Sequence, residues 1–252
     1  MLFEFSIFIV GLVVGSFLNV CIYRLPKEKS ILYPPSHCYS CKQRLRPWDL
    51  IPVFNWLFLR GKCRYCATPI SGRYAIIEVF TGVLFMASLY IIGLSIELIK
   101  ALILTSFLIV ITFIDIDHQL ILDKVLIWMA GAGVAINLFI GPPTPGMWQM
   151  LLAAAVGGGV LLLIAVLTRG GMGGGDIKFM AVLGLWLGWP YIVITMLMSF
   201  IIGGVVGLVL LLLKRKGRKD FIPFGPFIAA AAYITFLYGT DILMWYFGQF
   251  LR

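Results

Sequence analysis

The feature of this sequence that most constrains its fold is a series of long apolar segments. A helix needs about 20 mostly apolar residues to cross a bilayer, and eight segments approach this length. Only 12% of the residues are charged, and the mean hydropathy is +1.02. A soluble domain of this length could not bury so large an excess of apolar residues. We therefore predict an all-α membrane protein, a polytopic bundle of about eight transmembrane helices. The segments are 5–23, 74–93, 98–115, 124–141, 147–168, 177–190, 191–213 and 226–248.

The distribution of basic residues predicts the topology. Ten of the 20 Lys and Arg residues lie in 24–73, and five more lie in 214–219. If 24–73 is cytoplasmic and the eight segments alternate, 18 basic residues lie inside, and only Lys100 and Arg252 lie outside. Glu4 precedes the first segment where a signal peptide would carry basic residues, so we expect this segment to remain as a helix. Topology and anionic lipid account for the basic character, and we predict no nucleic-acid partner.

The chain then divides into a first transmembrane helix (1–23), a polar cytoplasmic insert (24–73, hereafter the insert) and a transmembrane part (74–252). The insert contains two CxxC pairs separated by 21 residues, Cys38 with Cys41 and Cys63 with Cys66. Four thiolates at this spacing complete a closed tetrahedral shell around one structural zinc ion. Two disulfides or free redox pairs are the alternative, although a cytoplasmic location disfavours stable disulfides. Cys21 lies in the first helix and is expected to serve packing.

Two aspartates are predicted at one end of the bundle. The third apolar segment ends at Asp115, and the sixth begins just after Asp176, so both carboxylates lie on the cytoplasmic side. Two close carboxyl groups can share one proton, so that one acts as a base on water and the other as an acid. Alternatively, the carboxylates of Asp115 and Asp117 merely cap or solvate the end of one helix, and Asp176 caps the start of another. His118 is a rival catalytic group, but a histidine in an interfacial loop is more often simply solvated.

Glycine occupies five of the six positions that precede Asp176. Glycine in a helix costs about 1 kcal/mol relative to alanine, so such a run weakens local order. Glycine also allows close backbone approach and positive φ. The stretch is therefore either a plain loop or a site where the backbone and the Asp176 carboxylate both contact another group.

Six short motifs follow one another along nearly the whole chain. They are Gly15–Val20 with Arg24–Pro26; the CxxC pairs with Arg46–Trp48 between them; Arg73–Tyr74 with Glu78; Phe113–Asp115 with Asp123; Gly173–Asp176 with Lys178; and Ile222–Pro226. In this order they resemble the type IV prepilin peptidase family, bifunctional leader peptidases and N-methyltransferases of the GxGD aspartic protease group. The chain has Leu122 before Asp123 where that family commonly has proline.

The resemblance implies a function and a set of site residues. It implies that Asp115, eight residues before Asp123, and Asp176 are catalytic, with Gly173, Gly175 and Lys178 in the supporting loop. It also implies cleavage of the basic leader of prepilins or pseudopilins at the cytoplasmic face of the bacterial inner membrane. The new N-terminal residue would be methylated with S-adenosylmethionine. The sequence contains no dinucleotide-type glycine fingerprint after a strand, so it names no residues for that cofactor.

Two other functions remain open from the sequence. One is a GxGD protease with other membrane substrates, against which the cysteine insert and the first-helix motif argue. The other is a zinc-stabilised scaffold or transporter. Such a protein would have no proteolytic activity, so Asp-to-Asn changes at positions 115 and 176 would cause no loss of proteolysis.

Overall fold

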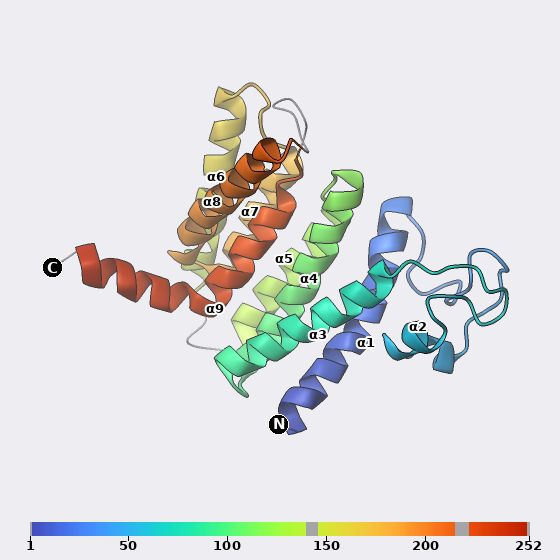
Figure 1. Cartoon of the computed structure of the whole chain (residues 1–252). Coiled ribbons are helices and arrows are strands. Elements are labelled where there is room, and N and C mark those ends of the chain that lie inside the picture. Colours follow the sequence, from blue (N-terminus) through green and yellow to red (C-terminus); the bar gives the residue numbers. More distant parts are fainter. Residues whose placement is uncertain (1, 140–145, 215–221, 251–252) are drawn as a thin grey trace. The chain divides into compact units, whose positions relative to one another are not determined.

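The computed structural model describes residues 2–139, 146–214 and 222–250, and within them every regular element is a helix. Each of the eight predicted apolar segments coincides with a helix, which confirms the all-α class (Figure 1). The corresponding helices are α1 (Leu2–Arg24), α3 (Arg73–Ile92), α4 (Ile96–His118), α5 (Asp123–Phe139), α6 (Met147–Leu167), α7 (Gly174–Leu187), α8 (Tyr191–Leu212) and α9 (Gly225–Phe250).

Not all of these helices are long enough to span a bilayer unaided. Six of them have the length and apolar composition of a membrane span over the described residues. The exceptions are α5, with 17 residues, and α7, with 14, against the roughly 20 that a span requires. Eight spans therefore stay a prediction, whereas a multi-pass membrane protein is confirmed.

The chain forms two compact units, residues 1–110 and 111–252, and α4 passes from one to the other. The first unit holds α1, the insert, α3 and the greater part of α4, and the second holds the end of α4 and α5 to α9. The predicted functional division at residues 23 and 73 stays a prediction.

In the first unit, α1 and α3 pack closely because small residues line their contact. A methyl group placed on Gly11 would lie 2.6 Å from the Cα of Gly82, and one on Gly15 would lie 2.8 Å from the Cα of Glu78. Small residues that let two backbones approach are typical of helix pairs in membranes, where packing rather than water exclusion drives association. This contact places Glu78 directly against α1.

The insert has little regular structure. It contains the 3₁₀ turns η1 (Leu25–Lys27) and η2 (Pro47–Leu50) and the single-turn helix α2 (Phe54–Phe58). Two isolated antiparallel bridges, His37 with Arg44 and Lys62 with Pro69, enclose the two CxxC pairs. So little secondary structure leaves the insert dependent on side-chain interactions for its stability.

In the second unit, α7 is the central helix and contacts α5, α6, α8 and α9. Phe179, Met180, Leu183 and Trp186 are completely buried along it, as expected for a helix that is apolar on all sides. The Trp186 indole donates a hydrogen bond to the Met129 carbonyl of α5 at 2.9 Å. A short helix can thus be held at membrane depth by its neighbours.

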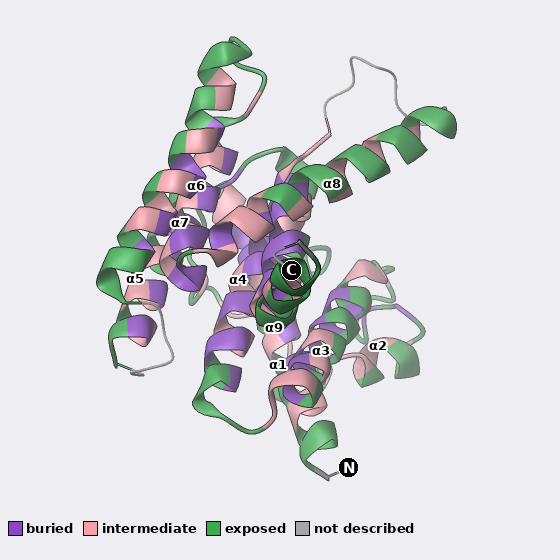
Figure 2. Cartoon of the chain, turned by 90° about the vertical axis from the view of Figure 1, so that its left-hand side faces the viewer, coloured by how far each residue is buried: buried purple, intermediate pink, exposed green. Residues whose placement is uncertain are grey.

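The second halves of α8 and α9 carry mostly exposed apolar residues (Figure 2). On α8 these include Val205, Leu208 and Leu212. Apolar side chains on helices of this length are suited to contact with lipid.

Candidate functional site

Asp115 lies in the last turn of α4 and is buried, with 4% of its surface exposed. The neighbouring Asp117 and His118 are exposed on the same turn. A buried ionisable group at the end of a membrane helix is costly and usually functional, whereas exposed ones are readily solvated. The structure therefore distinguishes Asp115 from both of its sequence rivals by burial.

Asp176 lies in the first turn of α7 and is also buried, with 7% of its surface exposed. Gly173 is the N-cap residue of this helix, and its backbone hydrogen-bonds to the Asp176 carboxyl group. A methyl group on Gly173 would lie 2.9 Å from Asp176 Oδ2. Asp176 is thus held by the turn that the glycines form, and it is not itself the N-cap.

The two carboxyl groups, hereafter the carboxylate pair, are close enough to interact electrostatically. Ile121 lies beside them, between the first turns of α7 and α9. A methyl group on Gly175 would lie 2.9 Å from the Ile121 Cβ, and one on Gly225 would lie 3.3 Å from its Cδ1. The ends of α4, α7 and α9 therefore converge around the carboxylate pair. Such a pair can supply a base and an acid to the same bond.

Gly225, the first residue of α9, contacts Asp115 directly. Its N–H donates a hydrogen bond to Asp115 Oδ2 at 3.0 Å, and a methyl group on Gly225 would lie 2.6 Å from the same oxygen. Gly225 lies within the motif Ile222–Pro226, and the sequence alone indicates no role for it. Nothing local in that motif reveals a partner 110 positions away.

The three predicted supporting residues, Gly173, Gly175 and Lys178, make different contacts. Gly173 and Gly175 are places of close approach, to Asp176 and Ile121 respectively, whereas nothing lies within 4 Å of a methyl group on Gly174. Lys178 does not contact the carboxylate pair, because its Nζ forms an exposed 2.8 Å ion pair with Asp123 at the start of α5. Lys178 therefore links α7 to α5 at the edge of the site.

The four cysteines of the insert form one cluster, hereafter the four-cysteine cluster: Cys38, Cys41, Cys63 and Cys66. Their sulfur atoms all lie within 4.8 Å of one another, and the Cys38 and Cys66 sulfurs are 3.8 Å apart. Tetrahedral zinc with bonds of about 2.3 Å needs sulfur atoms about 3.8 Å apart, so this donor set fits the ion. All four are free thiols rather than disulfides, and Cys21 is buried in α1.

The two halves of the cluster share one local geometry. The Cys38 N–H donates to the Gln43 carbonyl, and the Cys63 N–H donates to the Thr68 carbonyl, five residues on in each case. Lys42 and Ala67, four residues after these cysteines, both have positive φ. Such paired turns aim two sulfurs of each pair at one point, as a shared metal requires.

Asp49 connects the parts of the insert. Its carboxylate accepts hydrogen bonds from the Arg46 N–H (3.0 Å), the Tyr65 hydroxyl (2.8 Å) and the Arg64 guanidinium (2.6 Å). Burial alone would raise the pKa of Asp49, but these three donors outweigh it and lower the pKa below its usual value. Asp49 therefore joins η2, to which it belongs, to the second CxxC pair as an ionised group.

Comparison with known proteins covers most of the chain. Residues 9–92 match the bacterial peptidase A24 N-terminal domain, and residues 102–208 match the type IV leader peptidase family. A Bacillus subtilis (strain 168) protein is 38% identical, covering 95% of this chain and 96% of its own. Proteins of Aeromonas hydrophila and Legionella pneumophila are each 34% identical and cover 97% and 98% of this chain and 94% and 96% of their own. All three are named prepilin leader peptidase/N-methyltransferase. No solved structure gave a significant match.

Proposed function

Because the chain belongs to the type IV leader peptidase family, we propose that it removes the basic leader of type IV prepilins or pseudopilins. It then N-methylates the new terminal residue, with S-adenosylmethionine as the methyl donor. It is a multi-pass protein of the bacterial inner membrane. Its partners are the prepilin substrates and the lipid bilayer.

Cleavage is assigned to the carboxylate pair, and the observation that carries this is the burial of two interacting carboxyl groups at the ends of different helices. The ionised member takes a proton from a water molecule, which attacks the carbonyl carbon of the scissile bond. The protonated member donates to the carbonyl oxygen, and a proton then passes to the leaving amine. The Gly225 N–H positions Asp115 for this step.

Zinc is assigned a structural role in the insert. The four-cysteine cluster would hold one ion with all four coordination positions filled by sulfur, which leaves none for water or substrate. The ion would therefore stabilise a segment with little secondary structure and would take no part in cleavage.

The active site is assigned to the cytoplasmic face. This rests on the charge distribution, with 18 Lys and Arg residues on one predicted side and two on the other. A basic prepilin leader obeys the same rule, so its scissile bond would be held on the same face.

The assignment of the carboxylate pair is tested by single Asp-to-Asn changes. Asp115→Asn and Asp176→Asn should each lower the cleavage rate at least about 10³-fold, since each removes an acid–base group. Asp117→Asn is the matched control, because Asp117 is exposed two residues from Asp115 and should retain most activity. Cleavage of a model prepilin by the purified protein in detergent provides the measurement, and normal processing by either of the first two variants would contradict the assignment.

The two activities are separated by the mass of the product. Wild-type protein should shorten the prepilin with or without S-adenosylmethionine, and the product should gain one methyl group only when the donor is present. Asp115→Asn should still methylate a substrate that was cleaved beforehand. A product that never gains a methyl group would contradict the transferase half alone.

A further inference from the structure

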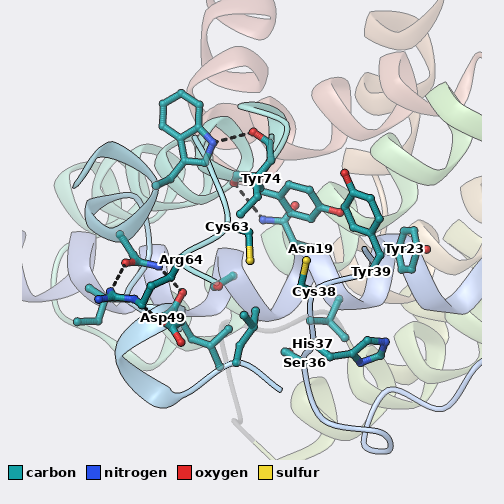
Figure 3. Close-up of a pocket in the computed structure, with 18 of the residues that line it drawn as sticks. Asn19, Tyr23, Ser36, His37, Cys38, Tyr39, Asp49, Cys63, Arg64 and Tyr74 are labelled. Carbon is teal, nitrogen blue, oxygen red and sulfur yellow. Dashed lines mark hydrogen bonds and ion pairs between the residues drawn. The ribbon is translucent and has the colours of Figure 1, made fainter. Parts of the chain in front are cut away.

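A cavity of about 630 Å³ lies in the first unit, between the insert and the adjoining turns of α1 and α3 (Figure 3). Ligand pockets in proteins typically measure about 300–1,000 Å³. All of its lining residues fall between Ser16 and Glu78, so it contains neither member of the carboxylate pair. Cys38 and Cys63 line it, so the four-cysteine cluster shapes its wall.

One side of the cavity is aromatic. Tyr23, Tyr39 and Tyr74 lie together there (Figure 3). Trp56 also lines the cavity. The Tyr23 ring already receives a cation, since Lys27 Nζ lies 3.5 Å from its centroid. Aromatic rings of this kind stack on flat heterocycles and attract positive charge. The wall therefore suits a ligand that combines a purine with a cationic centre.

Of the two carboxylates that line the cavity, Asp49 and Glu78, the first is already committed to the insert. Both Asp49 oxygens accept hydrogen bonds, one from Arg64 and the other from Tyr65 and the Arg46 N–H. Glu78 differs because it lies in the second turn of α3, a membrane-spanning helix. It is the carboxylate placed to meet a ligand at the membrane edge.

Glu78 is buried, with 7% of its surface exposed, and is held from two sides. The Val53 N–H donates to Glu78 Oε2 at 2.7 Å, and the Ser16 side chain of α1 hydrogen-bonds to the same carboxyl group. Val53 has φ +61° and ψ −54°, a conformation that a β-branched residue rarely adopts. Strained backbone of this kind clusters at binding sites, and here it aims an N–H at the carboxylate.

From these features we propose that the cavity binds the methyl donor S-adenosylmethionine and that Glu78 receives the amino group to be methylated. This rests on the proposed function of the chain as an N-methyltransferase. The purine and the sulfonium of the donor match the aromatic side, and Lys42 and Lys62 line the same cavity and match its carboxylate. The acceptor is a positively charged amine of a membrane substrate, and Glu78 places a carboxylate on the membrane-spanning helix α3 to bind it.

The transfer step requires a neutral amine. The α-ammonium of the cleaved substrate gives one proton to the Glu78 carboxylate, which passes it on to water. The nitrogen lone pair then forms a bond to the methyl carbon, the carbon–sulfur bond breaks, and its electron pair stays on sulfur as a neutral thioether. The methylated nitrogen carries the positive charge that the sulfonium has lost.

The donor site is tested by binding to the full-length protein in detergent, with S-adenosylhomocysteine as the calorimetric probe. Tyr74→Ala and Tyr39→Ala should each weaken binding about tenfold, which is near the upper end of the effect of losing one stacking or cation contact. Trp48→Ala is the matched control, because Trp48 is a largely exposed aromatic of the insert that does not line the cavity. Zinc content and prepilin cleavage should match wild type in all three. Unchanged affinity in both tyrosine variants, with zinc and cleavage intact, would overturn the site.

The role of Glu78 is tested with Glu78→Gln and a substrate cleaved beforehand. Glutamine keeps an oxygen for the Val53 N–H but cannot take a proton, so methylation should fall about 10²–10³-fold. Donor affinity, zinc content and cleavage should stay within about threefold of wild type, which a merely structural role would not predict. Normal methylation by Glu78→Gln, or a parallel loss of donor binding and cleavage, would overturn the role. Failure of the wild type to methylate or bind the donor would instead contradict the proposed transferase function.

Discussion

Gly225 and Gly175 show at the scale of single residues how the carboxylate pair depends on the absence of side chains. A methyl group on Gly225 would lie 2.6 Å from Asp115 Oδ2, and one on Gly175 would lie 2.9 Å from the Ile121 Cβ. Neither glycine has positive φ; in the stretch before Asp176, that conformation occurs only at Arg169 and Gly170. The glycines next to the carboxylate pair are therefore required for close approach rather than for an unusual backbone conformation.

Alanine at these positions should separate close approach from helix propensity. Gly225→Ala and Gly175→Ala should each slow cleavage about 100-fold, because a displacement of about 1 Å in a catalytic group has effects of this size. Gly174→Ala adds the same methyl group to the same turn with nothing within 4 Å, so it should cleave like wild type. Initial rates of prepilin cleavage provide the measurement. Equal losses at positions 174 and 175 would argue against close approach as the reason.

Asp49 is the residue on which the insert should depend most for its stability outside the cysteines. Asp49→Asn should destabilise the insert by about 1–3 kcal/mol, since it weakens charge-assisted hydrogen bonds at a buried carboxylate. Because the pKa of Asp49 is lowered on folding, its contribution is complete above about pH 4 and is lost as the pH falls through the lowered pKa. Faster release of zinc to a chelator reports the change. Glu28→Gln, an exposed position of the insert, serves as the control and should leave the release rate unchanged.

At the scale of elements, the insert is held by short-range turns and the four-cysteine cluster rather than by a core. Its three helical turns span three to five residues each, and its two bridges are isolated. The zinc ion proposed for this cluster would supply free energy directly to the folding of a segment with so little hydrogen-bonded structure. The helices of the second unit instead gain their stability from close packing.

Metal analysis should therefore find about one zinc per chain, as a single four-thiolate site requires. Replacing one ligand, for example Cys63→Ser, should unfold the insert more than it alters the carboxylate pair. Methylation should then suffer at least as much as cleavage, because Cys63 also lines the cavity of the first unit. Protein without zinc and with Cys38–Cys41 or Cys63–Cys66 disulfides, purified without chelator, would refute the assignment.

At the scale of the whole molecule, the proposed orientation in the membrane rests on the distribution of charge. Single cysteines introduced as Ser30→Cys, Thr144→Cys and Gly217→Cys test it in intact cells. Only position 144 should react with an impermeant reagent added outside, in comparison with the unsubstituted protein, because the positive-inside rule predicts that the basic segments stay inside. Labelling at position 30 or 217 would place the carboxylate pair on the opposite face. Positions 144 and 217 lie outside the described residues, as do Asp220 and the basic residues of 215–219.

Acidic residues around the site should compensate its basic surroundings when a basic leader binds. We expect charge reversal at one or more of Asp117, Asp123 and Asp220 to weaken substrate capture without loss of the carboxylate pair. Asp123→Lys would also place a second positive charge opposite Lys178, whose Nζ lies 2.8 Å from the Asp123 carboxylate. A raised KM with an unchanged kcat is the expected result, and a fall in kcat alone would point to the catalytic step instead.

Periodic hydrophobicity and the spacing of reactive residues are properties of the sequence alone, and they determined the helical class, the positions of the apolar helices and the two CxxC pairs. They also determined the candidate aspartates, because ionisable residues are rare at membrane depth. What the tertiary structure decided are contacts between residues that are distant in sequence: the Gly225 N–H on Asp115, the ion pair of Lys178 with Asp123, and Glu78 against Val53. The burial of the short helix α7 likewise depends on the neighbouring helices that surround it. Such contacts are set by how helix ends meet in space, and no local pattern in the chain encodes that meeting.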